Sequence, residues 1–157
     1  LFFLFPISVL VKIINLVNKD YAPIFYSHVR IGKNGKEFKL YKYRSMKPNA
    51  DELLKEMLKD EKYAKEWREN QKLENDPRIT KVGKILRKTS LDELPQFINV
   101  LLGHMSLIGP RPLVKGELDE HNGNHEIYES VKPGITGWWA CNGRSNISAS
   151  ERKKLEL

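Results

Sequence analysis

Two adjacent carboxylates, Asp92 and Glu93, are the side chains of this sequence best suited to covalent chemistry at phosphorus. We expect them in the first turn of a helix, where backbone amides and the helix dipole keep a carboxylate charged at neutral pH. A charged carboxylate can attack phosphorus as a nucleophile, and its neighbour can hold a Mg²⁺ ion that offsets the charge of a diphosphate. A structural alternative stays open, because Ser90 and Glu93 have the spacing of a helix capping box.

Three arginines stand where the local sequence orients them toward an anion. Arg87 shortly precedes the carboxylates on a basic helix, Arg111 lies between two prolines with fixed backbone angles, and Arg144 follows a glycine that permits close backbone approach. A guanidinium fork matches phosphate oxygens in a bidentate manner, so arginine suits a diphosphate site better than lysine. Each arginine taken alone is more typical of a surface charge, whereas together they favour a phosphate site.

A β-hairpin should lie upstream of these residues, at about residues 24–46. The segments on both sides of Asn34 and Gly35 are rich in β-formers, and Asn-Gly is the strongest short-range indication of a two-residue hairpin turn. Since side chains alternate along a strand, Lys42 and Arg44 should share a face with apolar residues. They then need an anionic partner, unless a bulge turns them to solvent or their stems extend along the surface.

Helical periodicity follows in three places. Residues 50–74 predict an amphipathic, mixed-charge helix or helix pair capped by Asn49. Residues 78–90 predict a basic helix with apolar side chains, including Ile85, on one side and lysines on the other, which suits a membrane surface or a nucleic acid equally well. The third helix carries the two carboxylates and should end at Gly103, and the glycine-rich and proline-rich sequence beyond it predicts loops.

The sequence opens in an apolar run, LFFLFPISVLVKIINLV. Up to Lys12 this run is shorter than the roughly 20 residues that a spanning helix needs, and Pro6 interrupts it. The end of an ordinary transmembrane helix and the apolar core of a signal peptide are the alternatives, although no cleavage-like small-residue site follows.

Size and charge bound the remaining possibilities. With 157 residues, 40% of them hydrophobic, the chain suffices for one domain with a modest core, which argues against disorder. Its 27 lysines and arginines against 20 acidic residues leave a net charge of +7, which favours polyanions, anionic lipids or phosphorylated substrates. Cys141 is the only cysteine, which excludes an intramolecular disulfide and a cysteine metal cluster and fits a reducing compartment.

Three strings occur in the order YKYRSM, DPRITKVGKILRKTSLDELPQFINVLLGHMSLIGPRP and VKPGITGWWACNGRSNIS. Together, over about residues 31–148, they resemble the bacterial sugar transferase family of monotopic phosphoglycosyl transferases. The resemblance implies an enzyme that moves a sugar 1-phosphate from a nucleotide-sugar, expected to be a UDP-hexose, to polyprenyl (undecaprenyl) phosphate. The helical insertion at residues 48–75 resembles that of the larger subgroup, which initiates exopolysaccharide, capsule or O-antigen chains.

The resemblance also implies roles for individual residues. Asp92 would be the nucleophile that carries a covalent phosphosugar, and Glu93 would be the ligand of Mg²⁺. The implied phosphate-binding cations are Lys42, Arg87, Arg111 and Arg144. Membrane lipids are a further implied partner and nucleic acid is not, since the family works at the cytoplasmic face of the bacterial inner membrane.

The expected fold is therefore α+β and mainly helical, with a small β-hairpin. Residues 1–18 should form part of a re-entrant membrane helix broken at Pro6, and residues 19–157 a cytoplasmic catalytic domain that is truncated at its C-terminus. The family usually has an acidic residue where this chain has His104. Two alternatives remain, a basic nucleic-acid-binding module and an inactive, membrane-associated interaction protein.

Overall fold

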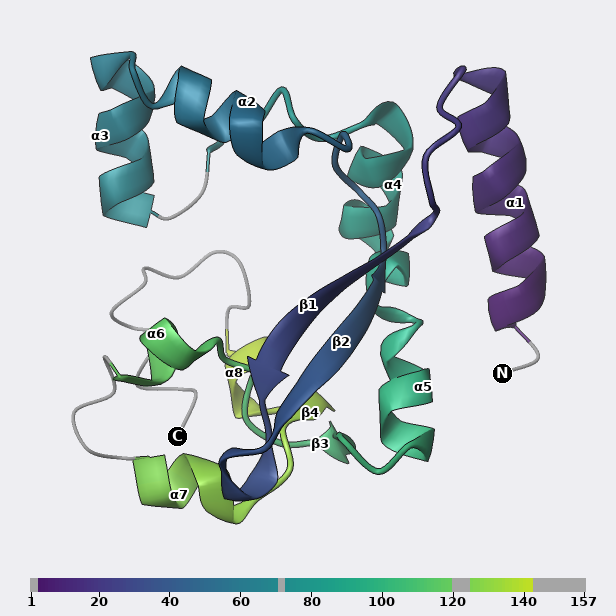
Figure 1. The fold of residues 1–157 in the computed structure, drawn as a ribbon. Helices are drawn as coiled ribbons and strands as arrows, with labels where there is room; N and C mark the ends of the chain where they lie inside the picture. The colour runs from purple at the N-terminus through teal and green to yellow at the C-terminus, as the bar shows by residue number, and fades with distance from the viewer. Residues whose placement is uncertain (1–2, 71–72, 120–124, 143–157) are drawn as a thin grey trace. The chain divides into compact units, whose positions relative to one another are not determined.

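The computed structural model describes residues 3–70, 73–119 and 125–142, which have the expected α+β composition (Figure 1). The chain divides into two compact units, each described here by itself. The hairpin unit comprises Tyr26–Lys42 and the described residues from Glu93 onward. The helical unit comprises the described residues up to Phe25, together with Tyr43–Asp92.

Helix α1 (Leu4–Val17) opens the helical unit and runs alongside α4 (Figure 1). The helix break predicted at Pro6 is not observed, because α1 continues through this residue. Pro6 lies in the first turn, where a helix does not need the backbone N–H that proline lacks. Among the described residues, no helix combines the length and apolar character needed to cross a membrane.

Two hydroxyl groups meet at the first turn of α1. The Ser8 hydroxyl donates to the Leu4 carbonyl at 2.7 Å, and the Tyr43 hydroxyl lies 2.7 Å from Ser8 Oγ and 3.1 Å from the same carbonyl. Tyr43 is almost fully buried, and its ring stacks on that of Phe25. The turn that contains Pro6 is therefore held by polar side chains.

The predicted hairpin is confirmed by strands β1 (Phe25–Ile31) and β2 (Glu37–Tyr43). Its connection is longer than the expected two-residue turn. A short 3₁₀ segment, η1 (Lys33–Gly35), joins the strands, and the Gly32 amide donates to the Lys36 carbonyl at 2.8 Å. Asn34 and Gly35 both have positive φ, at 59° and 69°. The Asn-Gly dipeptide thus supplies the left-handed conformations that the sequence indicated, within a three-residue loop.

Lys42 of β2 and Arg44, which follows this strand, each have a carboxylate partner within their own unit. In the helical unit, Arg44 donates to both oxygens of Asp20 at 2.8 Å, with its side chain only 9% exposed. In the hairpin unit, Lys42 pairs with Glu93. Neither a bulge nor extension along the surface is needed to accommodate them, because ion pairing offsets the loss of hydration.

The rest of the helical unit consists of α2 (Ala50–Met57), α3 (Glu61–Asn70) and α4 (Lys81–Thr89), which confirms the helix pair. Thr80 caps α4, since its hydroxyl accepts from the Gly83 amide at 2.9 Å. On this helix Val82 and Leu86 are buried, whereas Ile85 is 62% exposed.

Gly83 marks the closest approach of α4 to the segment after β2. A Cβ atom on this residue would lie 1.9 Å from the Ser45 carbonyl oxygen, a backbone atom that cannot move aside as a side chain can. We expect Gly83→Ala to lower the free energy of unfolding by at least about 1–3 kcal/mol, because the helix must shift. Gly116→Ala is the matched control, since a Cβ there meets nothing within 4 Å. Chemical denaturation of both variants gives the comparison, and equal stabilities would contradict the close approach.

The hairpin unit contains the predicted third helix as α5 (Gln96–Leu101) and adds short elements beyond it, where the sequence predicted only loops. They are β3 (Ser106–Ile108), α6 (Lys115–Asp119), α7 (His125–Ser130), β4 (Gly134–Thr136) and α8 (Trp138–Cys141). Strands β3 and β4 pair in parallel, and α7 packs against η1 of the hairpin (Figure 1). Gly103, with φ of 77°, follows the end of α5 as predicted, and the next amide donates to the Asn99 carbonyl at 2.9 Å.

Two buried polar side chains organise this unit. The fully buried Asn99 accepts from the Tyr41 amide at 3.0 Å and donates to the Lys39 carbonyl at 2.7 Å, so that α5 is tied to β2. The Tyr128 hydroxyl accepts from the Leu113 amide at 2.9 Å and lies 3.1 Å from the Ile31 carbonyl. Buried amide and hydroxyl groups that are hydrogen-bonded in this way fix the relative position of the segments they join.

Candidate functional site

Asp92 and Glu93 lie in a 3₁₀ turn, η2 (Leu91–Glu93), and not in the first turn of an α-helix. Ser90 is the left-handed C-cap of α4, with φ of 61°, and α5 begins later with Pro95 as its N-cap. The capping-box interpretation of Ser90 is therefore wrong, because an N-cap residue has an extended backbone. The two carboxylates are placed by the end of one helix and not by the dipole of the next.

Glu93 pairs with Lys42 from the hairpin. Lys42 Nζ donates to Glu93 Oε1 at 3.1 Å, and the two side chains are 31% and 20% exposed. The alternation along β2 explains this contact, because it directs Lys42 to the same face as buried Leu40. A half-buried ammonium is thus held directly beside one of the two carboxylates.

Arg87 lies in the last turn of α4, in the same unit as Asp92. Its Nε donates to Ser45 Oγ at 2.9 Å. Partial burial lowers the pKa of the Arg87 guanidinium from its usual value, while the carboxylates of Asp92 and Asp76 act in the opposite direction. The guanidinium remains protonated at neutral pH, so each carboxylate of the motif has a fixed cation in its own unit.

Arg111 belongs to a three-residue ion cluster within the hairpin unit. Its Nη2 donates to Glu117 Oε1 at 2.6 Å, and Arg30 Nη1 donates to Glu117 Oε2 at 3.3 Å. Burial raises the pKa of Glu117, but the charge and hydrogen bond of Arg111 outweigh it and the net pKa lies below the usual value. The cluster of two guanidinium groups and one carboxylate carries a net positive charge beside the Pro110–Pro112 segment.

The structure therefore pairs Lys42 with Glu93, places Arg87 within electrostatic reach of Asp92, and commits Arg111 to an ion cluster with Glu117 and Arg30. Arg144 lies outside the described residues. Sequence reasoning missed Ser45 and Glu117 as partners of the arginines. Ser45 belongs to the YKYRSM string, and this membership could have identified it as a site residue. Nothing in the local sequence pattern distinguishes Glu117.

Comparison with known proteins connects this geometry to a family. The sequence model described as bacterial sugar transferase matches residues 1–157. The chain belongs to the bacterial sugar transferase family. The resemblance stated from the three sequence strings is thus confirmed.

Several curated members of the family are similar to this chain. The undecaprenyl-phosphate galactose phosphotransferase of Salmonella typhimurium is 50% identical over 137 residues, which are 87% of this chain and 29% of that protein. The exopolysaccharide production protein ExoY of Sinorhizobium fredii is 48% identical over 85% of this chain and 59% of its own length. The UDP-glucose:undecaprenyl-phosphate glucose-1-phosphate transferase of Escherichia coli is 44% identical over 78% of this chain and 24% of its own length. The chain therefore spans between about a quarter and three fifths of these relatives.

The residue that departs from the family pattern, His104, lies just after α5 in the hairpin unit. Its ring centroid is 5.7 Å from that of Phe38, with the planes tilted by 31°, and its amide donates to the Asn99 carbonyl. The imidazole thus packs on an aromatic ring of the core. An aromatic contact of this kind needs no acidic partner.

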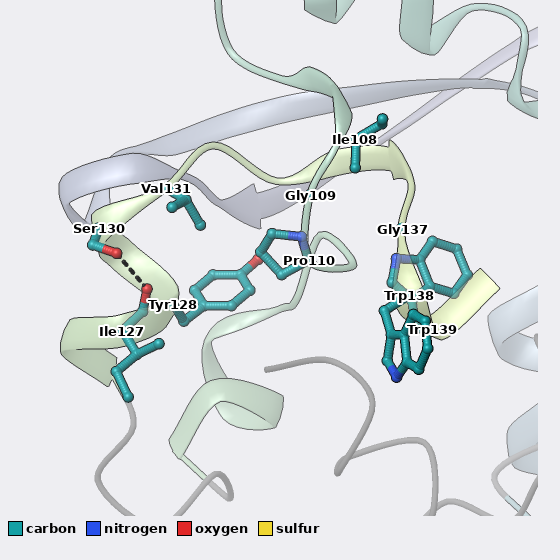
Figure 2. A pocket seen from close by; sticks show the side chains of 10 residues that line it. All are labelled: Ile108, Gly109, Pro110, Ile127, Tyr128, Ser130, Val131, Gly137, Trp138 and Trp139. Atoms are coloured by element: carbon teal, nitrogen blue, oxygen red, sulfur yellow. Dashed lines mark hydrogen bonds between the residues drawn. The ribbon is translucent and has the colours of Figure 1, made fainter. Parts of the chain in front are cut away.

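A cavity of about 370 Å³ lies in the hairpin unit beside the Arg111 segment (Figure 2). Its lining includes Pro110, Tyr128, Trp138 and Trp139, and none of the described residues that we predicted to bind phosphate lines it. The described lining is apolar and aromatic in character, so it suits an uncharged group. Among the described residues, no group of three or more His, Cys, Asp or Glu side chains is placed to hold a metal ion.

Proposed function

We propose that this chain carries the catalytic centre of an enzyme that transfers a sugar 1-phosphate from a nucleotide-sugar, a UDP-hexose, to undecaprenyl phosphate, and so initiates an extracellular polysaccharide. The observation that carries the proposal is the motif Asp92–Glu93, in which each carboxylate has a cation beside it in its own unit. The activities for which the Salmonella and Escherichia relatives are named, at 50% and 44% identity to this chain, support it.

In the first half of the proposed reaction, an oxygen of the Asp92 carboxylate attacks the phosphorus that bears the sugar. The bond between that phosphorus and the bridging oxygen breaks, and the nucleoside monophosphate leaves with the bonding electron pair. Asp92 then carries the phosphosugar as an acyl phosphate. Arg87 and Lys42 would balance the charge of the diphosphate, which is how fixed cations accelerate phosphoryl transfer.

In the second half, an oxygen of undecaprenyl phosphate attacks the same phosphorus and releases the Asp92 carboxylate. Glu93 would hold a Mg²⁺ ion together with phosphate oxygens, since carboxylate and phosphate oxygens are the ligands that Mg²⁺ prefers. The donor set fits this ion, because Glu93 presents a carboxylate that is 20% exposed. When bound, the ion would neutralise charge on the diphosphate. Lys42 would then orient Glu93 through their ion pair.

The test is a screen of the full-length protein against nucleotide-sugars. We expect one donor to give release of nucleoside monophosphate that continues only when polyprenyl phosphate is present. Membranes that carry the Asp92→Asn variant are the control for background hydrolysis. Failure of every donor, with a folded protein and acceptor present, would favour the inactive interaction protein, and salt-sensitive binding to DNA without membrane partitioning would favour the nucleic-acid module.

We also propose that α1 is part of a re-entrant membrane helix at the cytoplasmic face of the bacterial inner membrane, with residues 19–157 in the cytoplasm. Its exposed apolar side chains, such as Phe5, Leu10 and Val17, support contact with lipid. In the full-length protein, single cysteines can be placed at the two ends of the re-entrant helix, one of them at Asn18. Both should react with an impermeant maleimide only from the cytoplasmic side. Labelling of either position from the opposite side would indicate a spanning helix.

Arg111 is proposed to bind phosphate groups of donor or acceptor. Arg111→Ala should lower kcat/KM by about one to two orders of magnitude, because a charge-assisted hydrogen bond is lost in the transition state. Arg68→Ala is the matched control, since Arg68 pairs with Glu61 on an exposed surface, where ion pairs contribute little. Unchanged kinetics of Arg111→Ala with normal expression would remove this residue from the site and leave its contact with Glu117 as its role.

A further inference from the structure

Ser45 lies against α4 and is 8% exposed. Its carbonyl and its hydroxyl are both engaged in the helical unit. The Ser45 carbonyl accepts from the Thr80 amide at 3.0 Å, and the hydroxyl oxygen accepts from Arg87 Nε at 2.9 Å. Within the part of the chain that the structure describes, this is the one hydrogen bond that the Arg87 side chain makes.

The position of Ser45 is fixed by the segments around it. Residues 45–47 run antiparallel to residues 78–80, with a bridge between Met46 and Ile79 and a hydrogen bond of 2.8 Å from the Lys47 amide to the Arg78 carbonyl. Gly83 lets α4 come close enough that no Cβ would fit above the Ser45 carbonyl. The backbone that carries the Ser45 hydroxyl is therefore held in place against α4.

A hydrogen bond at Nε has a specific consequence for an arginine. The side chain has many rotamers when it is unrestrained, and its guanidinium is planar. A hydrogen bond at Nε fixes the position and the plane of the guanidinium group, and the two terminal nitrogens lie on its far side. Those nitrogens are the donors that bind two phosphate oxygens in a bidentate manner.

We propose that Ser45 is a positioning residue for the transfer reaction, which acts by aiming the Arg87 guanidinium at the phosphate beside Asp92. This inference rests on the proposed function. It assigns a role to the serine of the YKYRSM string that is separate from that of any group touching the substrate. Because Ser45 acts through Arg87, its effect depends on the presence of the arginine.

A double-mutant cycle in the full-length protein tests this. The measured quantity is the rate of the first burst of nucleoside monophosphate from a single turnover, which reports formation of the aspartyl phosphosugar. Ser45→Ala should lower this rate roughly tenfold, about what losing one hydrogen bond to a charged group costs. In an Arg87→Ala background, Ser45→Ala should have no further effect. Thr89→Ala is the matched control, since it removes a hydroxyl of α4 that bonds only to main-chain oxygens.

Each outcome decides the proposal. An equal loss in both backgrounds would mean that Ser45 only stabilises the fold, and an unchanged burst in Ser45→Ala would remove it from the reaction; both overturn the positioning role while the enzyme remains active. Absence of any burst from the unaltered protein would overturn the proposed function, and the positioning role with it. If Ser45→Ala does not fold, Arg87→Lys decides, because lysine keeps the charge but lacks the Nε donor. A wild-type burst in Arg87→Lys would overturn the inference.

Discussion

Asp92→Asn is expected to lower turnover by roughly four or more orders of magnitude, as deletion of the nucleophile does in covalent enzymes. The amide keeps the shape of the side chain but has neither the charge nor the nucleophilicity of the carboxylate. Glu93→Gln should behave differently, raising the Mg²⁺ requirement while leaving measurable activity. Consecutive residues of a helical turn point in different directions, so only one of the two carboxylates can be in line with the phosphorus.

The direct measurement is mass spectrometry of a digest after incubation with nucleotide-sugar and no polyprenyl phosphate. A phosphosugar should appear on the peptide that contains Asp92 and should be absent from the Asp92→Asn protein. Fragmentation distinguishes the two adjacent carboxylates. An adduct on Glu93, or full activity of Asp92→Asn, would contradict the assignment.

The largest expected effect on stability comes from the buried ion pair of the helical unit. Arg78 donates to both oxygens of Asp76, at 2.8 and 2.7 Å, and the two side chains are 5% and 4% exposed. Asp76→Ala should lower the free energy of unfolding by about 3–5 kcal/mol, because it leaves the Arg78 charge buried without a partner. The Trp67 ring, 5.3 Å from the guanidinium carbon, cannot replace a carboxylate.

Stability of this pair should also depend on pH. Burial raises the pKa of Asp76, but the hydrogen bonds and charge of Arg78 outweigh it, so the folded-state pKa lies below the usual value. A depressed pKa in the folded state means that the stabilisation is complete above the unfolded-state pKa of about 3.9 and is lost as pH falls below it. Urea unfolding should therefore show a steeper loss of stability in acid for the unaltered protein than for Asp76→Ala.

Glu56→Gln is the matched control for both measurements. Glu56 pairs with Lys59 on the surface, where each side chain is 71% exposed, so its removal should change stability by less than about 0.5 kcal/mol. A stability loss in Asp76→Ala as small as in Glu56→Gln would show that the buried pair contributes little beyond what its burial costs.

The elements that local chemistry determines were predictable from the sequence. Asn34 and Gly35 marked the hairpin because both adopt positive φ at small cost, and Gly103 marked the end of α5 for the same reason. The helix pair after Pro48 and the basic helix α4 followed from periodicity. In each case the decisive interactions lie within a few residues of one another.

The partners of Lys42 and Arg87 were not predictable, because they are distant in sequence. Lys42 meets Glu93 51 residues away, and Arg87 meets Ser45 42 residues away. Ser90 was misassigned for a related reason. Its capping-box spacing to Glu93 is a local pattern, but the sequence does not show that α4 ends at Ser90 in a left-handed conformation. Whether Ser90 begins a helix or ends one depends on tertiary packing, which cannot be read from a single sequence.

The Asn99 side chain protects part of the exposed edge of the two-stranded sheet. A free strand edge is a template on which another chain can add a strand and begin an aggregate. The amide of Asn99 occupies the Tyr41 N–H and the Lys39 carbonyl, which lie on the same edge of β2. One side chain thus takes the place of a third strand at these two backbone groups, so that they are not available to pair with another chain.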